Sequence, residues 1–232
     1  MNVDYFKKEC ARVQHILSDH VEQIPNRFYE AVRHVCNKEY ASGGDVLHRG
    51  FYCPSIIIDC IAGNIKRGKL LHSSRAKGQP SFSYGFDEND RLITVSHANK
   101  HELIWYENEI EVGITFSETQ SFMDICYFSE CIYKNNRIQS YSFYQVLPSS
   151  SCPVFMTREE YEYTETHMQV DFFQFCNDKP WMLDKCHYDF PITNGCLTTY
   201  QSSIGQQEKQ SCQKRTIPKL TDDGPYKRYH VD

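Results

Sequence analysis

The chain has 232 residues, of which 40% are hydrophobic and 14% aromatic, enough to build a folded core and to exclude wholesale disorder. Its formal net charge is −5, which argues against a nucleic-acid partner, because phosphate binding needs a positive surface. The 11 cysteines are an odd number, residues 1–8 lack the apolar stretch of a signal peptide, and no apolar run is long enough to span a bilayer. These features predict a cytoplasmic protein with reduced thiols and no membrane partner.

The N-terminal region, residues 1–75, has the apolar spacing of helices. Between residues 3 and 24 the apolar side chains recur every three or four positions, and a second such stripe follows Pro25, which is tolerated in the first turn of a helix. We expect the second helix to end before the glycine pair at 43 and 44. The apolar residues of 54–71 fit either a buried strand or a short helix, and we favour a short helix that begins at Pro54 and is broken by Gly68.

In residues 80–176 the period of the pattern changes to two, which is typical of strands. Four hairpins are predicted, each with an aromatic residue before a polar turn and an aliphatic residue after it: Phe86/Leu92, Tyr106/Ile110, Tyr133/Ile138 and Tyr163/Met168. Consecutive hairpins pair with their neighbours, so the predicted fold class is α+β, with N-terminal helices followed by a mostly antiparallel β-meander. The helices are expected to cover one face of the sheet.

Residues 177–232 are expected to be a loop-rich extension of the same domain. It should pack through its large apolar side chains, which are Trp181, Met182, Tyr188 and Phe190.

The sequence contains no recognisable catalytic or cofactor motif, so no cofactor is expected. Cys186, His187 and Cys196 could supply a nucleophile or zinc ligands, but Cys186 and His187 are adjacent in sequence, which makes it awkward for both to face one ion. Buried or idle thiols are therefore favoured over a metal site. His97 and His101 flank a turn and are predicted to be surface histidines.

The carboxylates of the predicted strands form a second candidate site. A strand alternates its side chains between two faces, so Glu109 shares a face with Glu111, and Glu160 shares one with Glu162. In one sheet these side chains form an acidic ladder edged by tyrosines such as Tyr161. The simpler interpretation is a solvated sheet face, and the sharper one is a docking face that attracts a basic protein partner.

Residues 84–92 resemble the Y-x-Y-D-x-x-G-R-L motif of the YD repeats in Rhs-type proteins, with Phe86 in place of the second Tyr and Asp90 in place of the Gly. In size, acidity and general pattern the whole chain resembles the small cytoplasmic immunity proteins encoded beside bacterial polymorphic and contact-dependent toxins. The resemblance implies a non-enzymatic protein that binds a cognate toxin domain and occludes its active site. We expect the contact to include Glu109, Glu111, Glu160, Tyr161 and Glu162.

Two other classes of function stay open. One is a small hydrolase or nuclease that uses the Cys and His residues of the extension. The other is a structural module that self-associates through exposed sheet edges.

Overall fold

The computed structural model describes residues 1–57, 67–71, 80–118, 123–135, 137–147, 151–179, 181–193, 196–197 and 201–204. In these residues two helices, α1 (Val3–His20) and α2 (Ile24–Arg33), precede an antiparallel sheet. The α+β class and the β-meander predicted from hydrophobic periodicity are thus confirmed in outline. No helix among the described residues is long and apolar enough to cross a membrane.

From β3 to β12 the strands follow one another across the sheet as they do along the chain, whereas β1 lies between β3 and β2. Their spatial order is β12-β11-β10-β9-β8-β7-β6-β5-β4-β3-β1-β2, and β13 pairs with β11. The strand bounds are β1 (Asn37–Ser42), β2 (Lys69–Leu71), β3 (Phe82–Phe86), β4 (Leu92–His97), β5 (Lys100–Glu107), β6 (Ile110–Glu118), β7 (Met123–Lys134), β8 (Arg137–Leu147), β9 (Cys152–Tyr163), β10 (His167–Cys176), β11 (Leu183–Thr193), β12 (Cys196–Leu197) and β13 (Gln201–Ile204).

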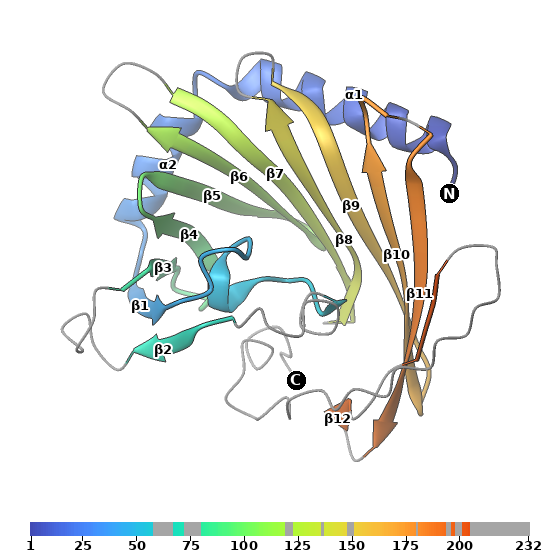
Figure 1. The fold of residues 1–232 in the computed structure, drawn as a ribbon. Helices are drawn as coiled ribbons and strands as arrows, with labels where there is room; N and C mark the ends of the chain where they lie inside the picture. The colour runs from blue at the N-terminus through green and yellow to red at the C-terminus, as the bar shows by residue number, and fades with distance from the viewer. Residues whose placement is uncertain are drawn as a thin grey trace.

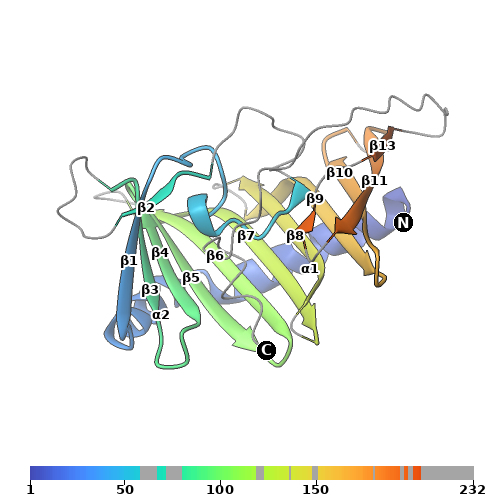
Figure 2. The same ribbon diagram turned by 90° about the horizontal axis from the view of Figure 1, so that it is seen from below.

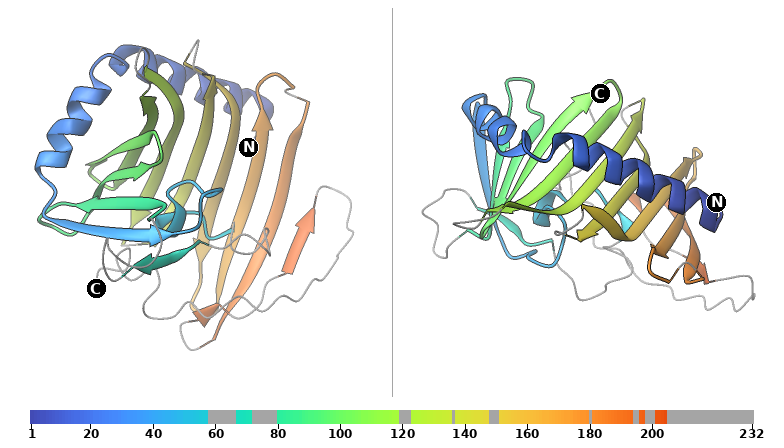
Figure 3. Two further views of the ribbon diagram at one scale, coloured as in Figure 1. Left: turned by 60° about the vertical axis from the view of Figure 1, so that its left-hand side comes forward. Right: turned by 90° about the horizontal axis from the view of Figure 1, so that it is seen from above.

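The sheet curves into an open trough, and each of its two faces is covered by a different part of the chain (Figure 1). Helix α1 runs across the outer, convex face, as the view from above shows (Figure 3). Residues 43–57, which we call the inner segment, lie in the hollow on the concave side (Figure 2). A short 3-10 turn, Gly50–Tyr52, forms part of this segment.

The apolar stripe of α1 packs on the convex face, as its spacing predicts. Phe6, Cys10, Val13 and Leu17 are all buried. The ring of Phe6 stacks on Phe175 of β10 at a centroid distance of 5.4 Å. Burial of this stripe is the main term that holds the helix, because propensity alone rarely stabilises a helix of this length.

The hairpin of residues 84–92 is closed by the side chain of Asp87. Its carboxylate accepts hydrogen bonds from the backbone N–H groups of Asn89 and Arg91 and from the Arg91 guanidinium, each at 2.9 Å. Asp90 has a φ of 60°, the left-handed conformation that the turn needs. The aromatic residue before the turn and the aliphatic one after it, Phe86 and Leu92, are both buried.

Three expectations for the flanking regions need revision. Residues 37–42 form strand β1, which the sequence pattern does not predict. The extension expected to be loop-rich contains the long strand β11, in which Tyr188 and Phe190 are buried as expected. Trp181 and Met182 do not pack: their exposed fractions are 77% and 49%. The helix favoured for 54–71 falls largely outside the described residues.

Candidate functional site

The concave face of the sheet presents its side chains in cross-strand rows. The outermost row runs across four strands through residues in direct register, Glu102, Thr115, Tyr127 and Gln145. The second row is Ile104, Gly113, Ser129 and Phe143. The third row runs from Tyr106 through Glu111, Cys131 and Tyr141 to Glu159. Neighbours within a row lie about 5 Å apart, so polar groups of one row interact.

Arg49 of the inner segment binds this face through a buried guanidinium. Its Nε lies 2.9 Å from Oε1 of Glu102, its Nη1 donates to Glu111, and its Nη2 donates to the Ser129 hydroxyl at 3.1 Å. Space for the guanidinium comes from Gly113, where any Cβ would lie 2.6 Å from Ser129 Oγ and closer still to Arg49 and Glu102. A glycine inside a strand is thus explained by the close approach of another chain segment.

His48 extends the same cluster. Because a carboxylate only accepts, Nε2 of His48 donates to Glu102 at 3.1 Å, while Nδ1 lies 2.8 Å from the hydroxyl of Tyr141. Burial by itself would raise the pKa of Glu102, but the charges of Arg49 and His48 outweigh it and lower that pKa to about 2. Glu102 is therefore an ionised, ion-paired carboxylate, and its low pKa makes it unsuited to act as a general base.

Glu159 lies at the other end of the third row and has a different environment. Its carboxylate accepts hydrogen bonds from the hydroxyls of Ser55 and Tyr161. Burial raises the pKa of Glu159 to about 7, although these two hydrogen bonds and the charge of Arg67 act in the opposite direction. Two glutamates on one sheet face thus have pKa values shifted in opposite directions.

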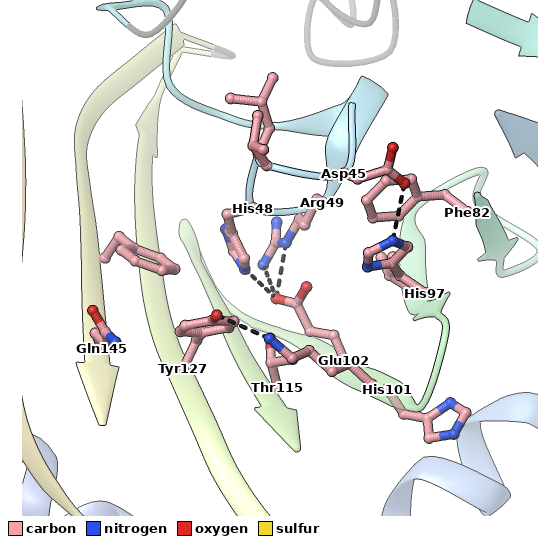
Figure 4. A pocket seen from close by; sticks show the side chains of 15 residues that line it. Asp45, His48, Arg49, Phe82, His97, His101, Glu102, Thr115, Tyr127 and Gln145 are labelled. Atoms are coloured by element: carbon pink, nitrogen blue, oxygen red, sulfur yellow. Dashed lines mark hydrogen bonds and ion pairs between the residues drawn. The ribbon is translucent and has the colours of Figure 1, made fainter. Parts of the chain in front are cut away.

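A cavity of about 270 Å³ lies between the inner segment and the outermost row. Its walls come from residues 45–49 and from strands β3 to β8 (Figure 4). Nζ of Lys100 lies 3.0 Å from the hydroxyl of Tyr127 in this cavity, and Nε2 of His97 lies 3.0 Å from the carboxylate of Asp45. His101 points away from the cavity toward the helices (Figure 4), where its ring contacts Phe28.

The predicted acidic ladder is not a single exposed face. Glu111 is 1% exposed and paired with Arg49, and Tyr161 is 5% exposed and bonded to Glu159, so the expectation that both lie on a solvent-exposed face is wrong. The alternation of faces holds, but the face that carries Glu111 is covered by the inner segment. Glu160 lies on the opposite, convex side and pairs with Arg158 at 3.1 Å.

Glu109 and Glu162 are exposed, and both lie beside turns at one edge of the sheet. In an antiparallel meander every second turn falls at the same edge, so the β3–β4, β5–β6, β7–β8 and β9–β10 turns share it. Exposed carboxylates at these turns are Glu88, Asp90, Glu107, Glu109, Glu162 and Glu165, and the exposed basic residues there are Arg91, Lys134 and Arg137. We call this surface, which lies at the turn ends of the strands and not along an outermost strand, the acidic edge, because its carboxylates outnumber its basic groups.

Cys186 and His187, which lie in the described part of the extension, do not form a nucleophilic pair with each other. Cys186 and His187 are consecutive in β11 and point to opposite faces of the sheet. Nδ1 of His187 lies 2.8 Å from Asp171, and partial burial raises the pKa of the Cys186 thiol. The side chain of Cys196 lies outside the described residues. Within the described part of the chain, no group of three or more His, Cys, Asp or Glu residues is placed to hold a metal ion.

The residues that form the buried cluster, His48, Arg49 and Glu102, are not found by sequence reasoning. They come from segments more than fifty positions apart, and none forms a motif. One signal was present: Gly113 interrupts the apolar strand Ile110–Phe116, and an interior strand glycine indicates the close approach of another group.

Comparison with known proteins gives no match, whether with family models, curated proteins or solved structures.

Proposed function

We propose that this protein is a non-enzymatic binding module of the immunity type, which captures a basic toxin domain on its acidic edge. The resemblance to small immunity proteins suggests the class of partner. The observation that carries the proposal is the gathering of exposed carboxylates, Glu109 and Glu162 among them, along one edge of the sheet. Such a surface attracts a basic partner and raises the rate of association.

The buried charged groups favour a binding role over catalysis. Arg49 is ion-paired with both Glu102 and Glu111. Cys186 and His187 point to opposite faces of the sheet. A catalytic acid or base needs a pKa near the working pH and access to a substrate. Glu102 has a pKa far below that range, and Glu159, whose pKa is suitable, is 1% exposed beneath the inner segment.

The test is binding to the toxin domains encoded by neighbouring genes. We expect capture of one such domain and a fall of about tenfold in the association rate at low salt when Glu109→Lys and Glu162→Lys are combined. The matched control is Asp19→Lys with Glu22→Lys, which changes the net charge equally on exposed positions near the end of α1. The proposal fails if no domain is captured, or if both double variants slow association equally.

A further inference from the structure

The cavity between the inner segment and the outermost row contains hydrogen-bond donors that have no acceptor among the described residues. Lys100 uses one of its three N–H groups on the oxygen of Tyr127, and its ammonium has no carboxylate partner among the described residues. Tyr127 accepts that bond, so its own O–H remains available to donate. The hydroxyl of Thr115, directly across the strand pair from Tyr127, is buried without a hydrogen-bond partner in the described structure.

These donors belong to one site because of the register of the strands. Thr115 and Tyr127 are paired residues of β6 and β7, and Lys100 lies two positions along β5 from Glu102, the partner of Thr115. All three residues line the same cavity, and Figure 4 labels Thr115 and Tyr127 there. A partly buried ammonium and two hydroxyl donors that have no acceptor among the described residues form a site for an anionic group.

The two carboxylates that line the cavity each have a basic partner. Glu102 is ion-paired with Arg49 at 2.9 Å and accepts a hydrogen bond from His48, and Arg49 is shared with Glu111, which does not line the cavity. Asp45 is the other carboxylate that lines the cavity, and it is paired with His97. Lys100 is therefore the charged group in this lining that the described structure leaves without an ion-pair partner.

Part of the cavity wall is apolar and aromatic. Phe82, Val95, Leu47 and Phe143 line it, and the rings of Phe82 and His97 stack at 4.3 Å. Small-molecule sites usually combine apolar side chains with a few convergent polar groups, and this cavity has both. The volume of about 270 Å³ suits a ligand with one ring and one acidic group.

We propose that this cavity binds a small organic acid. Its carboxylate or phosphate group pairs with Lys100 and accepts hydrogen bonds from Tyr127 and Thr115, and its apolar body lies among Phe82, Leu47 and Phe143. The site is separate from the acidic edge, so this inference does not depend on the proposed partner. Gln145 is exposed at the end of the same row and lies on the solvent side of the site.

The test uses two probes with the same ring and different acidic groups, benzoate and phenyl phosphate, in calorimetric titrations of the full chain. We expect at least one to bind saturably with a stoichiometry of one, and the tighter probe identifies which acidic group the site prefers. Lys100→Met should weaken binding by about ten- to a hundredfold, because it removes the charged donor. Tyr127→Phe should weaken it by about three- to tenfold, because it removes one neutral donor.

Lys134→Met is the matched control, since Lys134 is exposed at the β7–β8 turn and does not line the cavity. It should leave binding unchanged. Circular dichroism and the midpoint of thermal unfolding show whether each variant is folded. If Lys100→Met is not folded, the affinity of Tyr127→Phe relative to the control tests the proposal. The proposal is overturned if neither probe binds up to about 10 mM, or if binding by the folded cavity variants equals that of the control.

Discussion

Arg49 joins the inner segment to the concave face of the sheet through buried ion pairs. It has a φ of 60°, a left-handed conformation that is uncommon for a residue with a side chain, and Gly50 follows it with a φ of 52°. Such a conformation costs about 1–3 kcal/mol and persists where the surroundings enforce it. Here the ion pairs with Glu102 and Glu111 stabilise it, and the guanidinium lies over Gly113.

Removal of this guanidinium should be strongly destabilising. Arg49→Met leaves Glu102 and Glu111 buried without their cation, and we expect the free energy of unfolding to fall by about 3–5 kcal/mol. The control is Arg12→Met, which removes an arginine paired with Glu9 and Glu130 whose side chain is 40% exposed. This change should cost about 1 kcal/mol or less. Urea unfolding measures both.

A rescue variant separates the loss of charge pairing from a simple loss of packing. Arg49→Met combined with Glu102→Gln and Glu111→Gln removes the two stranded charges, so it should recover part of the lost stability. If the combined variant is less stable than Arg49→Met alone, the carboxylates are not the source of the effect.

At the level of elements, local patterns predict most of the fold. The hairpins from β3 to β10 are identified by a period of two and by turns such as Asn108 and Asn135, which take the positive φ that asparagine tolerates. Strand β1 has the sequence NKEYAS and no clear alternation. It exists because it pairs with β3 on one side and β2 on the other, contacts that involve residues distant in sequence.

The candidate site was harder to predict than the fold for a related reason. Strand alternation correctly places Glu111 and Val112 on opposite faces of the sheet, but it does not predict that both faces are covered. Glu111 is buried because Arg49, 62 positions away, reaches it from the inner segment. Glu109, beside a turn, stays exposed because no other described segment covers that edge.

Helix α1 should stabilise the sheet through its apolar stripe. Phe6 is fully buried against Phe173 and Phe175 of β10, so we expect Phe6→Ala to lower the free energy of unfolding by about 3–5 kcal/mol. Trp181→Ala removes a larger ring that is 77% exposed and should change stability by no more than about 0.5 kcal/mol. Equal effects in chemical unfolding would mean that the helix contributes little to the core.

For the whole molecule, the two buried glutamates of the concave face make stability depend on pH in opposite ways. The pKa of Glu102 falls from 4.5 to about 2 on folding, so its contribution is present above pH 4.5 and is lost as the pH falls toward 2. The pKa of Glu159 rises from 4.5 to about 7, so its contribution is fully present below pH 4.5 and is lost as the pH rises toward 7.

Glu159→Gln isolates the second effect, because glutamine keeps the shape of the side chain and does not ionise. One pKa unit corresponds to about 1.36 kcal/mol, so the wild-type chain should lose up to about 3 kcal/mol relative to this variant between pH 4.5 and pH 7. Urea unfolding at several pH values across this range gives the difference. Glu162→Gln, at an exposed position three residues along β9, serves as the control and should follow the wild-type profile. A constant difference between Glu159→Gln and wild type at every pH would show that Glu159 is ionised throughout, with its charge accommodated by Ser55, Tyr161 and Arg67.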